Sequence, residues 1–403
     1  MNSTRNSIDP EHIDDSSSQT RRLIDLWPIF AWMFLFMISN GVGITVMPVL
    51  AVLQSIPNWV LGIIGAIYFA GMFLGYFIGP PFVRAMGYKS SALLLLPIMF
   101  FGTIVLLTGS TTLWAVGRCL AGLGVGVSYI IAESWVAARA HSSIRMTALS
   151  IYITAAIFGI LAAQAALTRI DPSSLWAMAF GVITIIVASA LIAIAPVPEI
   201  ARRHSSNHHG RSLRIIRGAV VPLFGVFVSG ILFSIFVTFY PAFGAHHGMT
   251  PASVPLIGVI VMAGAAFVQP ILGRLAEHVA AYRLLMIVAI GSSCASIGLV
   301  MSGDVTISFY VLIAIWGATA LTTYPLYGGL AYAALPDEPT FDVARIVLIA
   351  YGVAEIAAPP LMGVMIDVWG ADWLFRAAAL FGGLLAAIIL IAQRFRREAA
   401  TRE

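Results

Sequence analysis

Residues 219–239 read AVVPLFGVFVSGILFSIFVTF, a run of twenty-one residues without a charged side chain. An α-helix rises about 1.5 Å per residue and the hydrocarbon core of a bilayer is roughly 30 Å thick, so about 20 apolar residues make one crossing. This run is therefore long enough to span a membrane as a helix.

Similar stretches fill the chain on both sides of this run. We predict twelve membrane-spanning helices, over residues 26–53, 60–78, 91–107, 113–136, 147–167, 175–195, 219–239, 254–272, 284–301, 307–330, 343–368 and 374–392. A membrane β-barrel is disfavoured, because its strands would be about 10 residues long with alternating polarity. The predicted fold class is an all-α polytopic membrane protein, which agrees with 60% apolar and 10% charged residues.

Basic residues predict the orientation, because lysine and arginine near a helix end resist translocation. If the N-terminus is cytoplasmic, all but Arg118, Arg169 and Arg376 of the 22 basic residues lie on the cytoplasmic side or close to it. An even number of spans then leaves both termini in the cytoplasm. We interpret the net charge of +4 as the result of these anchors, and expect no nucleic-acid partner.

The polar segments lie at the two ends and in the middle of the chain. Residues 1–25 carry no apolar core of a signal peptide and are expected to form a disordered cytoplasmic tail. Residues 196–218 form a predicted central cytoplasmic loop, and residues 393–403 a cytoplasmic C-terminal tail. His204, His208 and His209 could bind a metal, but no acidic or cysteine ligand accompanies them, so we expect a solvated loop and neither metal nor cofactor.

A short internal repeat divides the chain into two halves of six spans. Gly79, Tyr88 and Lys89 follow the second span, and Gly273, Tyr282 and Arg283 follow the eighth, 194 residues later. Both copies fall between the second and third spans of their half. A parallel repeat with its axis along the membrane normal accounts for this. The alternative is that cytoplasmic turns commonly collect glycine and arginine.

At these residues the chain resembles the major facilitator superfamily, whose signature in that loop is Gly-x-x-x-Asp-Arg-x-Gly-Arg-Arg. Gly79 and Arg84 match it, whereas Val83 occupies the acidic position, and Gly87 and Lys89 come one residue late. In the second copy Glu277 fills the acidic position and His278 replaces the arginine.

A second similarity lies in the fourth span. Arg118, Gly122 and Gly124 resemble the family pattern Arg-x-x-x-Gly-x-Gly, and Glu133-Ser134-Trp135 and Tyr324-Pro325-Leu326 resemble a bacterial branch with mostly unassigned substrates. The antiporter signature of the fifth span, with Gly-Pro near its end, is replaced by residues 158–164, FGILAAQ. The resemblance implies two six-helix bundles, residues 26–195 and 219–392, around a central cavity that opens alternately to each side.

Three charged residues inside predicted spans stand out, because an ion in the membrane is costly without a partner or water. Arg118 is expected either to attract an anionic substrate or modulate a nearby carboxylate, or else to snorkel to the outer interface. Glu133 can pair with Arg84 or Lys89 to hold a cytoplasmic gate closed, or can be an ordinary interface carboxylate. Glu355, near mid-bilayer, is the candidate for proton coupling. The alternative is a permanently protonated acid.

Other residues complete the candidate sites. Substrate or proton coupling is assigned to Arg118, Glu355, Asn40, Gln164, Gln269, Tyr324 and Tyr327. The cytoplasmic gate is assigned to Gly79, Arg84, Gly87, Lys89, Glu133, Gly273, Glu277 and Arg283. Polar side chains of this kind can equally form interhelical hydrogen bonds.

The sequence predicts a secondary active transporter of the plasma (inner) membrane that moves a small organic solute by alternating access, with proton coupling as one option for its driving force. A proton-independent uniporter and a membrane sensor are the alternatives. No phosphate-binding loop surrounds the single lysine, and no nucleophile elbow indicates an enzyme. We expect a monomer that binds its substrate within the lipid bilayer.

Overall fold

The computed structural model describes residues 25–140, 145–196, 212–336 and 338–400, and within them twelve helical segments are long and apolar enough to cross a membrane. This confirms the predicted all-α fold with twelve spans. The helices of the first half are α2 (Trp27–Leu53), α3 (Asn58–Met86), α4 (Tyr88–Ile104, continued by the 3-10 helix η1, Val105–Thr108), α5 (Thr111–Arg139), α6 (Arg145–Leu167) and α7 (Leu175–Ile194). Those of the second half are α9 (Val220–His246), α10 (Pro255–His278), α11 (Ala281–Met301), α12 (Ile307–Ala320), α13 (Thr323–Ala334), α14 (Thr340–Trp369) and α15 (Trp373–Ala400).

The predicted tenth span is interrupted. It forms α12 and α13, separated by Leu321 and Thr322. Pro325 explains the break, because its ring nitrogen has no hydrogen to donate to the carbonyl of Leu321, four residues earlier. At the break, the hydroxyl of Thr322 donates to the carbonyl oxygen of Ala318, at 2.8 Å.

Two predicted polar segments contain helix. The short helix α8 (Ser212–Gly218) occupies the end of the predicted central loop, and α15 continues through Ala400 into the predicted C-terminal tail. Arg214 of α8 pairs with Glu338, in the α13–α14 connection, at 3.3 Å. The three histidines of the central loop lie outside the described residues.

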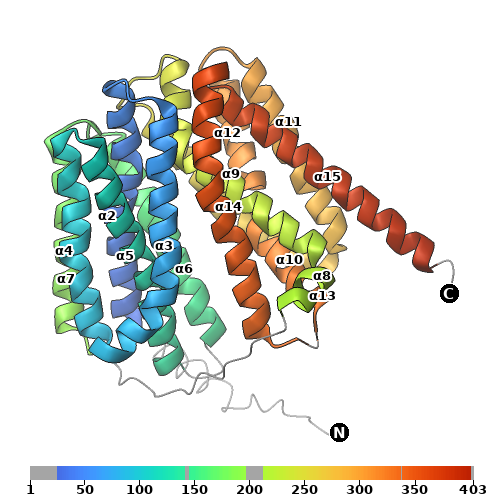
Figure 1. Ribbon diagram of the computed structural model, residues 1–403, viewed down its shortest axis with the longest axis horizontal. Helices are drawn as coiled ribbons and strands as arrows, with labels where there is room; N and C mark the ends of the chain where they lie inside the picture. The colour runs from blue at the N-terminus through green and yellow to red at the C-terminus, as the bar shows by residue number, and fades with distance from the viewer. Residues whose placement is uncertain (1–24, 141–144, 197–211, 337, 401–403) are drawn as a thin grey trace, which may run out of the picture.

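Figure 1 shows α2–α7, blue to green, grouped beside α9–α15, yellow to red. Many large apolar side chains on this assembly are exposed, among them Trp176, Ile194 and Phe267. Such a surface is unfavourable in water and suits contact with lipid chains.

Glycines allow a close helix contact in the first half, between α3 and α5. A side chain at Gly122 would collide with the backbone carbonyl of Tyr68, and one at Gly126 with that of Met72. On the opposite helix, Gly71 faces the backbone of Cys119 in the same way. Small residues at such positions let backbones approach each other inside a membrane.

The turn between α3 and α4 requires a glycine. Gly87 has φ +84°, a left-handed conformation that residues with a side chain rarely adopt. Its amide donates to the carbonyl oxygen of Val83, whose side chain is buried. The turn explains why a glycine stands here, and the burial accounts for valine at the position that is acidic in the family signature.

Candidate functional site

The two halves meet tightly at the end of the molecule where α2 ends and α3 begins, called here the distal end. Asp367, near the end of α14, accepts hydrogen bonds from the backbone amides of Asn58 (3.0 Å) and Trp59 (2.8 Å). It also accepts one from the side-chain amide of Asn58, at 2.8 Å. The carboxylate thereby caps the N-terminus of α3, where the helix dipole favours negative charge.

Further contacts close the distal end. The hydroxyl of Tyr240 in α9 donates to Thr45 in α2, at 3.1 Å, and both residues are buried. Gln164 of α6, a predicted cavity residue, packs against Gly258 of α10. Gly62 of α3 leaves room for the backbone of Pro359 in α14. Contacts between several helix pairs, among them α3–α14, α2–α9 and α6–α10, therefore join the halves at this end.

A buried polar cluster lies within the first half. The hydroxyl of Tyr68 donates to the side-chain oxygen of Asn40, at 3.2 Å. The guanidinium of Arg118 lies 4.0 Å above the centre of the Tyr68 ring, a cation–π geometry. Arg118 is only 4% exposed, so its side chain does not snorkel to an interface. Within the described residues its Nε has no hydrogen-bond partner.

Glu355 is buried in the second half, with 2% of its surface exposed. Within the described part of the chain, its Oε1 has no hydrogen-bond partner. Its carboxyl group interacts electrostatically with the phenols of Tyr68, Tyr76, Tyr129, Tyr324 and Tyr351. Three of these phenols belong to the first half, so Glu355 lies where the halves face each other.

Aromatic rings from five helices surround this region, and we call Tyr76, Tyr129, Tyr152, Tyr324 and Tyr351 the tyrosine cluster. The ring centres of Tyr129 lie 6.3 Å from Tyr76 and 6.5 Å from Tyr152. In the other half, Tyr324 and Tyr351 lie 4.5 Å apart. Tyr76 also interacts electrostatically with Tyr324, which connects the two groups.

Glu133 belongs to the same region. Its Oε1 accepts a hydrogen bond from the hydroxyl of Tyr152, at 2.6 Å, and the residue is otherwise exposed. The ion pairs found among the described residues are Arg214–Glu338 and His247–Asp372, so Arg84 and Lys89 do not pair with Glu133 in this conformation. Its gating role stays a prediction.

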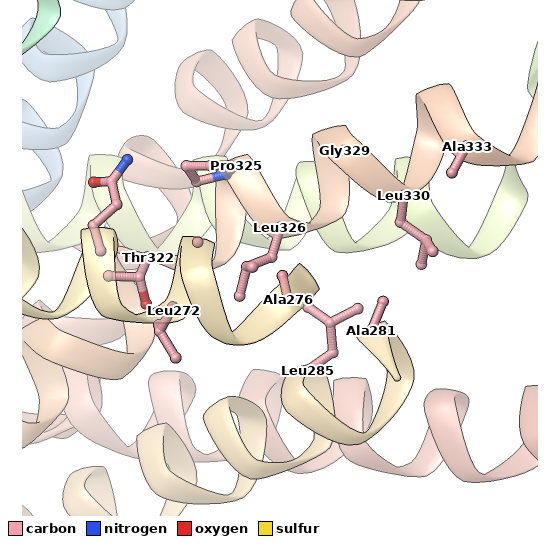
Figure 2. Close-up of a pocket in the computed structure, with 12 residues that line it drawn as sticks. Leu272, Ala276, Ala281, Leu285, Thr322, Pro325, Leu326, Gly329, Leu330 and Ala333 are labelled. Carbon is pink, nitrogen blue, oxygen red and sulfur yellow. The ribbon is translucent and has the colours of Figure 1, made fainter. Parts of the chain in front are cut away.

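Gln269 and Gly273 lie elsewhere, in a pocket within the second half. This pocket, of about 440 Å³, lies between α10, α11 and α13, beside the break in the tenth span. Figure 2 shows mostly apolar side chains around it, such as Leu272, Leu285 and Leu326. Gln269 is therefore separate from the tyrosine cluster.

The remaining predicted residues lie in three places. Tyr327 is buried against Gly225 of α9. Gly79 packs on Ile130 of α5. Arg84 and Arg283 are exposed at the ends of their helices, and Glu277 lies in the last turn of α10. The gate residues thus lie at the end opposite the distal end.

The most informative contacts involve residues that the sequence reasoning did not single out. These are Tyr68, Tyr76, Tyr129, Tyr152, Tyr351 and Asp367. A tyrosine within an apolar span is a usable signal, because its hydroxyl needs a partner that phenylalanine would not need.

Comparison with known proteins gives a consistent result. A family model described as Major Facilitator Superfamily matches residues 29–341. An uncharacterized MFS-type transporter of Yersinia pestis (strain Pestoides F) is 22% identical over 351 residues, which cover 85% of this chain and 89% of that protein. The uncharacterized MFS-type transporter YcaD of Salmonella dublin is 22% identical over 82% of this chain and 86% of its own length.

Solved structures share the fold. A bacterial homologue of the human lysosomal transporter Spinster, in an inward-facing and unoccupied conformation, superposes with a TM-score of 0.71 at 16% identity, covering 93% of this chain and 97% of that one. The nucleoside transporter NupG gives 0.75 at 11% identity, with 91% and 99% coverage. A D-xylose-proton symporter gives 0.68 at 15% identity, with 91% and 96% coverage.

Proposed function

Because this chain belongs to the Major Facilitator Superfamily and is a membrane transporter, we propose that it moves a small organic solute by alternating access, with proton coupling through Glu355. Relatives of the same fold include a nucleoside transporter and a D-xylose-proton symporter, which supports a small-solute substrate. The transporter is proposed to lie in the inner membrane with both termini in the cytoplasm, following the distribution of basic residues.

In this orientation the distal end faces away from the cytoplasm. The contacts of Asp367 with α3 and of Tyr240 with α2 then close the outer side. Exposure of Glu133, near the opposite end of α5, is consistent with an approach from the cytoplasm. The conformation described here therefore corresponds to an inward-facing state of the proposed cycle.

The proposal of proton coupling rests on the burial of Glu355, whose Oε1 has no hydrogen-bond partner among the described residues. A buried carboxylate without a partner is costly, whereas its protonated form is neutral and can donate a hydrogen bond. Rearrangement of the two halves changes the surroundings of this group, since phenols of both halves lie near it. A proton that binds one arrangement better than the other shifts the equilibrium between them.

Transport in proteoliposomes tests this proposal. We expect one or more solutes of a broad library to drive proton movement, reported by a pH-sensitive dye trapped in the vesicles. Solute uptake without proton movement would favour the uniporter. Binding without uptake of any solute would favour the sensor.

The distal closure provides a separate prediction about alternating access. Asp367→Asn removes the negative charge at the N-terminus of α3 and places an amide where an oxygen accepts from Trp59. Hydrogen bonds to a charged group contribute about 1.5–3 kcal/mol each, so we expect a population shift toward an outward-open state. Spin labels at Thr112 and Asp304, in a background with Cys119 and Cys294 replaced by serine, should then show longer distances.

Asp372→Asn is the matched control for this experiment. Asp372 lies close to Asp367 in sequence, and its partner His247 belongs to the same half, at 3.7 Å. Its removal should leave the label distances unchanged. Equal distances in wild type and Asp367→Asn would show that this carboxylate does not hold the distal end closed.

A further inference from the structure

Among the described residues, the charged side chains that act on Tyr76, Tyr129 and Tyr324 in the tyrosine cluster are both acidic. Glu133 and Glu355 both act on Tyr76, Tyr129 and Tyr324. Among described residues, the other groups that act on these three tyrosines are phenols. The positive charge of Arg118 acts instead on Tyr68, which is not part of the cluster, and lies over that ring. Within the described residues, two acids therefore act on these three tyrosines and no basic side chain does.

The rings supply a second feature that favours a positive charge. The face of a tyrosine ring attracts cations, and several such rings together can recognise a quaternary ammonium group. Tyr76, Tyr129, Tyr324 and Tyr351 are only partly buried, so part of each residue remains accessible. Glu355 adds an unsatisfied carboxyl oxygen, within the described residues.

From these observations we propose that the substrate is an aromatic organic cation, whose positive charge lies near Glu355 and whose apolar groups contact the tyrosine cluster. This inference rests on the proposed transport function and specifies its substrate class. Glu133 supplies a second negative charge near the cytoplasmic approach to the site.

An anionic substrate fits this region less well. It would have to approach Glu133 and Glu355 while Arg118 remains behind the Tyr68 ring, almost fully buried. A neutral sugar would leave the Glu355 oxygen without a charged partner. The geometry thus distinguishes the three classes by charge.

Binding to the full-length protein in nanodiscs tests the inference directly. The probe is tetraphenylphosphonium, and tetraphenylborate is its control, with nearly the same size and shape but opposite charge. Empty nanodiscs correct for partition into lipid. We expect saturable binding of tetraphenylphosphonium, measured by equilibrium dialysis, and no saturable binding of tetraphenylborate.

Variants separate the contributions of charge and ring. Glu355→Gln should weaken probe binding by at least about tenfold, whereas Asp304→Asn, which removes an exposed carboxylate in the α11–α12 connection, should not change it. Tyr351→Leu should weaken binding roughly 2- to 30-fold, and Tyr351→Phe should retain it, because the ring rather than the hydroxyl attracts the cation. Circular dichroism checks that each variant is folded.

Each outcome bears on one proposal. Equal binding of both ions, or unchanged binding in Glu355→Gln, would overturn the cation site. Proton-coupled uptake of a neutral or anionic solute, without binding of the cation, would also overturn it while supporting the proposed transport. If the cation binds but is not taken up into vesicles, and the spin-label distances do not change, the result would support the site but contradict transport.

Discussion

Replacing Glu355 with glutamine is expected to reduce solute-driven proton movement to the level of empty liposomes. Glutamine has nearly the same size as glutamic acid but cannot bind and release a proton near neutral pH. The measurement uses a saturating solute gradient and a trapped pH-sensitive dye, so that weaker solute binding does not imitate lost coupling. The buried position of Glu355 among phenols of both halves is the reason for the large effect.

Two further variants make this result specific. Glu355→Asp keeps a titratable group one methylene shorter and should retain part of the proton movement. Glu133→Gln removes the other acid of the region, which is exposed and hydrogen-bonded to Tyr152. If Glu355→Gln keeps full coupling while Glu133→Gln loses it, the coupling group is Glu133 and the proposed role of Glu355 is wrong.

Gly122→Val is expected to cause a large loss of stability. The new side chain would meet the carbonyl of Tyr68, a backbone atom that cannot rotate away. Overpacking of a core by a few methyl groups commonly costs about 1–3 kcal/mol, and rigid helix backbones place this case at the upper end or beyond. Thermal denaturation followed by size-exclusion chromatography should show a clearly lower apparent melting temperature.

Gly328→Ala is the control, because a side chain there meets no atom within 4 Å. Alanine is favoured over glycine in a helix by about 1 kcal/mol, so this variant should be at least as stable as the wild type. An unchanged melting temperature in Gly122→Val would mean that α3 and α5 can separate at little cost, contrary to the packing described.

The membrane fold was predictable because each span needs only an apolar run of sufficient length, and that property is local. The break between α12 and α13 was harder to place, since several other prolines lie inside continuous helices. Pro48 is within α2 and Pro359 within α14. Local sequence alone does not show which neighbouring helices compensate for a missing hydrogen bond.

The candidate site was only partly predictable. Arg118, Glu133 and Glu355 stood out because charge inside a span is unusual. Contacts between Tyr68 and Asn40, or between Asp367 and Asn58, depend on how helices distant in sequence are arranged. Gln164 and Gln269 resembled cavity residues by polarity, yet they lie at the distal closure and in a separate pocket. Their substrate roles, the monomeric state and the orientation of the termini stay predictions.

The interruption of the tenth span makes α13 a short helix that can tilt separately from α12. Tyr324 lies at the second residue of α13, directly after the break, and the twelve residues of this helix extend about 18 Å to the connection that contains Glu338. Because α12 is a separate helix, a ligand that displaces Tyr324 would tilt α13 while α12, the distal half of the span, stays in place. The far end of α13 would then move Glu338 and, through the ion pair, Arg214 of α8.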